Sequence, residues 1–123
     1  MDAAAFIRKR VCVVSNSAGV RALLAALIEA EGYTVADTET EETGLDRAAR
    51  FRPDALVVEA PTGQANALVT RLRARPELAG CGLLVISARL EVPAHSEGAW
   101  ATFSKPFDLL KLHAAVAACA HRY

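Results

Sequence analysis

The chain has 123 residues, of which 53% are hydrophobic, and its 14 basic and 14 acidic side chains give a formal net charge of zero. This length suits one domain with its own hydrophobic core, and the hydrophobic content argues against intrinsic disorder. The balanced charge argues against a nucleic-acid-binding or membrane-surface protein, because both carry a clear basic excess. No apolar run reaches the ~20 residues that span a membrane, and the first residues lack the order of a signal peptide. We therefore expect a single cytoplasmic domain over residues 1–123.

Five short apolar runs alternate with helical patterns along the chain. The expected strands are residues 11–14, 33–36, 55–58, 83–87 and 101–104. The expected helices lie at residues 17–31, 40–50, 64–75 and from 108 onward, with Asn16 or Ser17 as the first cap. Between the last two strands, residues 88–98 contain Pro93, so we expect at most a turn or two of helix there. This alternation predicts a doubly wound parallel α/β sheet with helices on both faces.

Cysteines, histidines and a basic run have simple interpretations. Three cysteines occur, at Cys12, Cys81 and Cys119. Their number is odd and their spacing matches no zinc pattern, so we expect buried thiols that form no disulfide. The histidines are scattered, at His95, His113 and His121, and we expect neither a metal ion nor another cofactor. Near the end of the third helix, helix-dipole complementarity and solvation account for Arg71, Arg73 and Arg75.

The stretch that organises the chain is the third strand and the carboxylate that ends it. Residues 55–58 are apolar throughout, as expected of a central strand that is buried on both faces. Glu59 follows at the carboxyl end, which is the edge of an open α/β sheet where ligands bind. Other polar residues follow the first, fourth and fifth strands, namely Ser15, Asn16, Ser87 and Lys105. The sequence therefore predicts one polar site at this edge.

Taken in order, these motifs resemble the receiver domain of two-component response regulators over essentially the whole chain. The matching pieces are residues 11–14 with the following polar pair, Arg21, residues 32–35, Pro53-Asp54, Ser87-Ala88, Gly98-Ala99 and Lys105-Pro106-Phe107. The resemblance implies a flavodoxin-like (βα)5 fold with strand order 2-1-3-4-5. Measured against the family, the segment from Ser87 to Lys105 is short, which implies a shortened helix between the fourth and fifth strands.

The chain departs from the family pattern at the positions that hold its chemistry. The resemblance places Ser15 and Asn16 where the family has an acidic pair that holds Mg²⁺. It places Glu59 where the family has the phosphoacceptor aspartate. The family's hydroxyl residue, lysine and aromatic switch residue correspond to Ser87, Lys105 and Thr102. The lysine and a hydroxyl are therefore kept, and the aromatic switch residue is lost.

These departures predict a degenerate phosphorylation pocket. Phosphoryl transfer to a carboxylate needs a divalent cation, and neutral Ser15 and Asn16 are poor Mg²⁺ ligands. Glu59 is one methylene longer than aspartate, which moves its nucleophilic oxygen by more than ~1 Å, and a misplacement on the order of 1 Å can cost about a hundredfold in rate. We therefore expect no catalytic residue and no metal. We expect Glu59 to pair with Lys105, either as a plain ion pair or as an imitation of the phosphorylated state near Ser87.

The expected function is a phosphorylation-independent, receiver-like protein-interaction module in bacterial signal transduction, without enzymatic activity. We expect no output domain within these 123 residues, so the output would come from binding signalling proteins or a second copy of the chain, with neither nucleic acid nor membrane involved. Candidate interface residues are Leu90, Val92 and Trp100, because tryptophan is enriched as an interface anchor, although Trp100 could instead fill the core. Two alternatives remain, a phosphoacceptor that uses a nonstandard residue and a flavodoxin-like binder of an anionic ligand at residues 15–19.

Overall fold

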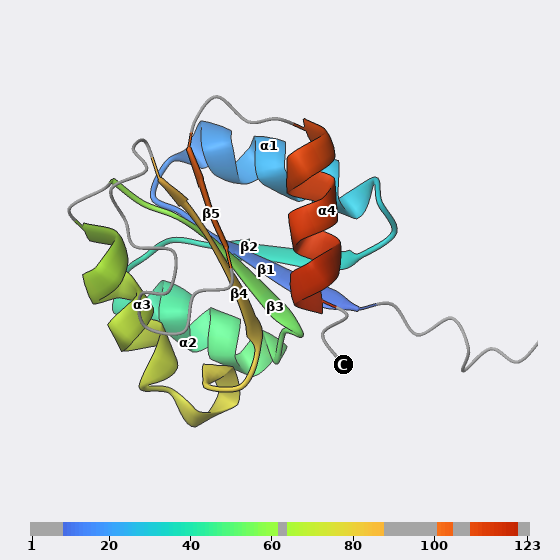
Figure 1. Cartoon of the computed structure of the whole chain (residues 1–123). Helices are drawn as coiled ribbons and strands as arrows, with labels where there is room; N and C mark the ends of the chain where they lie inside the picture. The colour runs from blue at the N-terminus through green and yellow to red at the C-terminus, as the bar shows by residue number, and fades with distance from the viewer. Residues whose placement is uncertain (1–8, 62–63, 88–100, 105–108, 121–123) are drawn as a thin grey trace, which may run out of the picture.

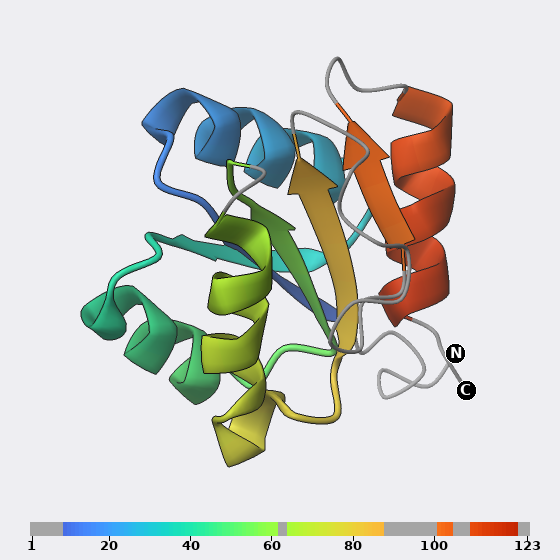
Figure 2. The same ribbon diagram turned by 60° about the vertical axis from the view of Figure 1, so that its left-hand side comes forward.

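The structure, a computed structural model, describes residues 9–61, 64–87, 101–104 and 109–120. These residues form a five-stranded parallel sheet in the order β2-β1-β3-β4-β5, with helices on both faces (Figures 1 and 2). The strands are β1 (Arg10–Val14), β2 (Thr34–Thr38), β3 (Ala55–Glu59), β4 (Gly82–Ser87) and β5 (Ala101–Ser104). The helices are α1 (Ala18–Glu29), α2 (Glu42–Phe51), α3 (Ala65–Arg73), the short 3-10 helix η3 (Pro76–Leu78) and α4 (Leu109–Ala120). The flavodoxin-like fold and the strand order expected from the sequence are confirmed.

The central strand β3 carries the polar site at its end. It lies between β1 and β4, and its Val57 is in register with Val13 on one side and Leu84 on the other. All residues of β3 are buried. Because both faces are covered, the strand is apolar without alternation until its last residue, Glu59.

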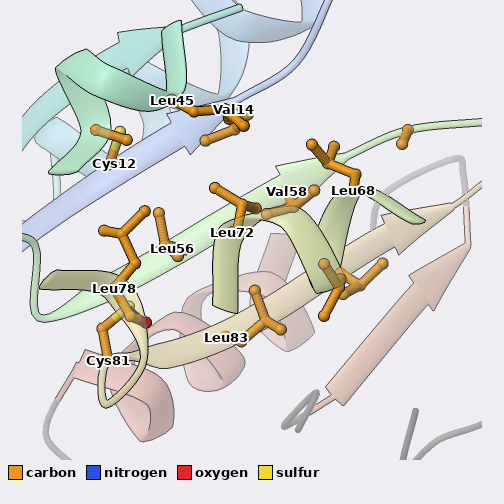
Figure 3. Packing of buried hydrophobic residues seen from close by; sticks show 14 of the residues in the cluster. Cys12, Val14, Leu45, Leu56, Val58, Leu68, Leu72, Leu78, Cys81 and Leu83 are labelled. Carbon is orange, nitrogen blue, oxygen red and sulfur yellow. Dashed lines mark hydrogen bonds between the residues drawn. The ribbon is translucent and has the colours of Figure 1, made fainter. Parts of the chain in front are cut away.

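The sheet separates two hydrophobic cores, because successive side chains of a strand point to opposite faces. The core that faces α2 and α3 includes Cys12, Leu56, Leu83, Leu45 and Leu72 (Figure 3). The core that faces α1 and α4 includes Val13, Val57, Leu84, Leu24 and Val116. The two helix pairs therefore hold the strand ends in a fixed relation, which positions the polar residues that follow them.

One close approach between a helix and the sheet depends on a glycine. A Cβ atom added at Gly82, the first residue of β4, would collide with the backbone carbonyl of Cys119 in α4. At Gly80, only two residues earlier, an added Cβ would meet no atom within 4 Å. The close packing of α4 against β4 therefore requires a residue without a side chain at Gly82.

The three cysteines are buried and form no disulfide, as expected from the sequence. Burial raises the pKa of the Cys12 thiol to about 12, and the nearby Asp37 and Cys81 add to the shift. Since the thiolate is the reactive form, Cys12 is inert in the folded chain.

Two local expectations need correction. Strand β2 was expected to end at Ala36, but it continues to Thr38, because Asp37 and Thr38 extend the parallel pairing with Val13 and Val14. The 3-10 helix η3 was not predicted, since the third helix was expected to end at residue 75 and no helix was expected after it.

Several expectations fall on residues outside those described. They are the shortened helix between the fourth and fifth strands, the interface candidates Leu90, Val92 and Trp100, the residues Lys105, His95 and His121, and the cap Asp108. The remaining histidine, His113, is exposed, and its Nδ1 lies 2.7 Å from Oε1 of Glu31. In the described ranges, no helix combines the length and the hydropathy that a membrane crossing requires.

Candidate functional site

The structure brings Ser15 and Glu59 into contact at the carboxyl edge of the sheet. Ser15 directly follows β1, Glu59 ends β3, and these two strands are neighbours. The Ser15 hydroxyl donates a hydrogen bond of 2.5 Å to Oε1 of Glu59. Ser15 is completely buried, and Glu59 is 7% exposed. This distance is at the short end for a hydrogen bond between a hydroxyl and an oxygen acceptor, so the contact is a strong one.

Ser15 is held by hydrogen bonds on every polar atom. Its backbone N–H donates to the carbonyl of Thr38 at 3.0 Å, which continues the β1–β2 ladder. Its carbonyl accepts from Nη1 of Arg21 at 2.7 Å. Its hydroxyl oxygen accepts from the N–H of Ser17 at 3.0 Å. Because a hydroxyl has a single proton, the one on Ser15 is committed to Glu59.

Asn16, the second residue of the neutral pair, has a structural partner of its own. Its Oδ1 accepts a 3.0 Å hydrogen bond from the backbone N–H of Thr40. This bond ties the loop after β1 to the loop after β2. Of the two residues expected to cap α1, Ser17 has that role, since its hydroxyl oxygen accepts from the N–H of Val20 at 3.3 Å.

A groove of about 550 Å³ opens beside Glu59, and we call it the carboxyl-edge groove. Its polar lining comprises Asn16, Ser17, Thr40, Glu59, Gln64 and Arg71, and its apolar lining comprises Ala60, Pro61, Ala67 and Leu68. The volume lies in the range of small-molecule and cofactor sites, roughly 300–1,000 Å³. Thr40 and Gln64 were not predicted as site residues, although each lies shortly after a strand, where the carboxyl-edge rule points.

The basic run on α3 is more specifically bound than the sequence suggested. Nη2 of Arg71 lies 2.8 Å from Oε1 of Glu42, and Nη2 of Arg75 lies 2.6 Å from Oε2 of the same carboxylate. Nη1 of Arg75 lies 2.5 Å from Oδ1 of Asp46. The hydrogen bond from Arg71 lowers the pKa of Glu42, and the one to Asp46 raises the pKa of Arg75. Arg71, which lines the groove, thus joins α3 to α2, and Arg75, which lies between α3 and η3, makes a second connection to α2.

Arg73 contacts the chain that follows its own helix. Its Nη1 donates to the carbonyl oxygens of Leu78, Ala79 and Cys81 at 2.9, 2.9 and 2.8 Å. The guanidinium group therefore holds η3 and the turn before β4. The expectation that this run serves only the helix dipole and solvation was incomplete.

The other predicted site residues are placed only by their backbones or lie outside the described chain. Ser87 ends β4, one residue beyond the position in register with Glu59. Thr102 lies in β5 in register with Val85. The ion pair between Glu59 and Lys105 stays a prediction, because Lys105 is not among the described residues.

The residues at this edge do not suit Mg²⁺. The family pattern implies a metal here, and Mg²⁺ takes oxygen ligands in octahedral array, with carboxylates among them. Ser15 directs its proton at Glu59, and Asn16 uses its amide oxygen on Thr40. Over the described ranges, no three His, Cys, Asp or Glu side chains group closely enough to hold a metal ion. The donor set therefore offers one carboxylate where the family pattern has several.

The strand order and the helices on both faces define a flavodoxin-like α/β domain. No protein-family model matches the chain. In sequence, it is 29% identical over 119 residues to the KDP operon transcriptional regulatory protein KdpE of Escherichia coli (strain K12). The match covers 92% of this chain and 52% of that protein, so the chain spans about half the length of this curated relative.

Solved structures show the same fold. A CheY-like response regulator receiver domain from Methylobacillus flagellatus superposes with a TM-score of 0.77 at 17% identity, over 91% of this chain and 98% of that one. The receiver domain of the sensor histidine kinase PA1611 from Pseudomonas aeruginosa PAO1, solved with a magnesium ion in its active-site cleft, gives 0.74 at 18% identity, over 92% and 98%. The chain has the fold of CheY-like response regulator receiver domains, and the resemblance drawn from its sequence is confirmed.

Proposed function

We propose that this chain is a degenerate receiver domain that acts through protein contacts without being phosphorylated. The observation that carries the proposal is the 2.5 Å hydrogen bond from Ser15 to Glu59. In the family pattern, the position of Ser15 holds an acid, and neighbouring carboxylates repel each other until a metal binds. Here a hydroxyl donor takes the place of the acid, so the Glu59 carboxylate is stabilised by the protein itself.

The chemistry of phosphorylation supports the same conclusion. A phosphoryl group approaching Glu59 brings negative oxygens that a divalent cation must neutralise. The neutral Ser15 and Asn16 are engaged with Glu59 and Thr40 and supply no carboxylate for that cation. The domain is then a binding module in signalling, with no enzymatic activity of its own.

Intact mass spectrometry tests the absence of phosphorylation. The full chain is incubated with Mg²⁺ and acetyl phosphate, and we expect no species heavier by about 80 Da, the mass of one phosphoryl group. The matched control is the triple variant Ser15→Asp, Asn16→Asp and Glu59→Asp, which restores the family's acidic pocket. We expect Mg²⁺ to raise the melting temperature of this variant but not that of the unaltered chain. Stoichiometric phosphorylation of the unaltered chain would overturn the proposal in favour of a nonstandard phosphoacceptor.

The protein contacts have their own test. We propose protein partners, with a second copy of the chain among them, and Leu90, Val92 and Trp100 as contact residues; nucleic acid and membranes are not proposed as partners. If Trp100 is an interface anchor, Trp100→Ala should keep its melting temperature and lose its complex in gel filtration. If Trp100 belongs to the core, the same variant should lose about 3–5 kcal/mol of stability instead.

A further inference from the structure

We infer that the carboxyl-edge groove is the docking site for a basic segment of a partner protein. The inference rests on the proposed function, because it names the surface and the partner chemistry of that binding module. Three properties carry it: the apolar lining of the groove, the charge of the chain beside it, and the engagement of the described basic side chains nearby.

The groove is lined in part by apolar side chains. Ala60 and Leu68 are buried, and Ala67 and Pro61 are exposed. The side chains of lysine and arginine lay their hydrocarbon stems on such apolar surface and keep the charged end in water. The groove can therefore accommodate long cationic side chains.

The chain beside the groove on the β2–α2 side is acidic. Thr40 lines the groove, and the exposed Glu39 and Glu41 precede and follow it in the sequence. In the described part of the molecule, neither glutamate forms an ion pair. Asp37, two residues before Glu39, is also exposed. A partner that carries phosphate groups would be repelled here, and a basic segment would be attracted.

Among the described residues, the basic side chains at this edge are already engaged. Nε of Arg21 lies 4.0 Å from Oδ1 of Asp37, and its Nη1 donates to the carbonyl of Ser15. Arg71, which lines the groove, pairs with Glu42. Each of these guanidinium groups is thus offset by a carboxylate, and Glu39 and Glu41 give the described chain beside the groove a negative charge. The expected attraction comes from the charges of Glu39 and Glu41 and not from the charge of Glu59, so the inference does not depend on which residues pair with Glu59.

Binding of a simple basic peptide tests the inference on the full chain. The probe is an acetylated, amidated octapeptide of alternating alanine and lysine, and the matched probe has glutamate in place of lysine. We expect the lysine peptide to shift the amide resonances of Asn16, Ser17, Thr40, Gln64 and Ala67. These shifts should shrink between about 50 and 300 mM salt, because salt screens exposed charges. The glutamate peptide should leave them unchanged.

Matched variants separate the groove from the rest of the surface. Ala67→Phe fills the groove from an exposed position on α3, and Ala118→Phe adds the same ring at an exposed position on α4, on the opposite face of the sheet. We expect Ala67→Phe to abolish the shifts and Ala118→Phe to leave them intact. Replacing Glu39 and Glu41 together by glutamine should weaken binding by about two- to tenfold.

Three results would overturn the inference: equal binding of the glutamate peptide, shifts that map to α1 and α4, or full binding by Ala67→Phe. Each is independent of the acetyl phosphate test. If the lysine peptide does not bind the groove and the chain is not phosphorylated, only the docking site is wrong. If the peptide binds and the chain is phosphorylated, only the phosphorylation-independent function is wrong.

Discussion

Ser15 and Glu59 meet across β1 and β3 at 2.5 Å, one as the donor and the other as the acceptor of a buried hydrogen bond. The contact joins the two central strands at the point where the strand order reverses. In the family pattern, neighbouring carboxylates at this edge repel each other until a metal binds, whereas here a hydroxyl group of the chain itself donates to the carboxylate. The contribution of this hydrogen bond to stability is therefore measurable without any ligand.

Ser15→Ala should lower the free energy of unfolding by about 1–3 kcal/mol, because the buried Glu59 loses a donor. Urea denaturation measures the change, and a double-mutant cycle with Glu59→Leu isolates the pair. The cost of the double variant should fall short of the sum of the single costs by about 1 kcal/mol. Costs that add within ~0.5 kcal/mol would mean that the two side chains do not interact.

A second double-mutant cycle, with Glu59→Gln and Lys105→Met, tests the ion pair between Glu59 and Lys105 that is expected from the sequence. Additive costs would mean that these two side chains are not in contact.

Gly82→Ala should destabilise the fold by about 1–3 kcal/mol, because the new methyl group forces α4 away from β4. Gly80→Ala is the matched control, since it adds the same methyl group where no atom lies within 4 Å. Its effect should stay within about 0.5 kcal/mol. Thermal denaturation of both variants decides the matter, and equal losses would contradict the packing of α4 described above.

Arg73→Ala should cost about 1.5–3 kcal/mol, because three carbonyls lose a charged donor. The amide protons of the turn before β4 should exchange faster in this variant. Arg71→Ala is the control on the same helix, and its loss should be much smaller, because its ion pair with Glu42 is exposed. Similar losses in both variants would show that Arg73 acts only through its charge.

Glu42 should make the stability of the chain depend on pH in the acidic range. Arg71 and Arg75 hold its pKa below the ordinary value of 4.5 in the folded state. Its stabilising contribution is therefore present above pH 4.5 and is lost as pH falls through the lower folded-state pKa. The stability difference between the unaltered chain and Glu42→Gln should shrink as pH is lowered from 7 toward the acidic limit. At about 1 M salt the difference should be small at every pH, and persistence there would argue against an ion pair.

Much of the fold could be predicted because its strands are short apolar runs at regular intervals. Residues 55–58 show the principle, since a strand buried on both faces needs no alternation and is easily recognised. The end of β2 could not be found in this way. Asp37 and Thr38 are polar, and only their pairing with Val13 and Val14 makes them part of the sheet.

The candidate site was predictable as a location but not as a set of contacts. The carboxyl-edge rule placed Ser15, Asn16 and Glu59 together. Which donor faces Glu59 depends on side-chain directions at the strand ends, and these have no signature in sequence. The same holds for Arg73, whose acceptors are backbone carbonyls in a turn.

The three buried cysteines can report local unfolding of the chain, because each becomes accessible only when the structure around it opens. An alkylating reagent modifies a thiol only when that thiol is exposed and ionised. Because Cys12 is buried and its pKa is raised to about 12, we expect it to react only after β1 separates from the core. Cys119 lies on α4, with its thiol 3.6 Å from the carbonyl of Leu83, so it reports when that helix departs. Cys81 reports the turn before β4, where its thiol donates to the carbonyl of Leu78. Timed alkylation followed by peptide mass spectrometry would rank these openings in the native chain, without any introduced label.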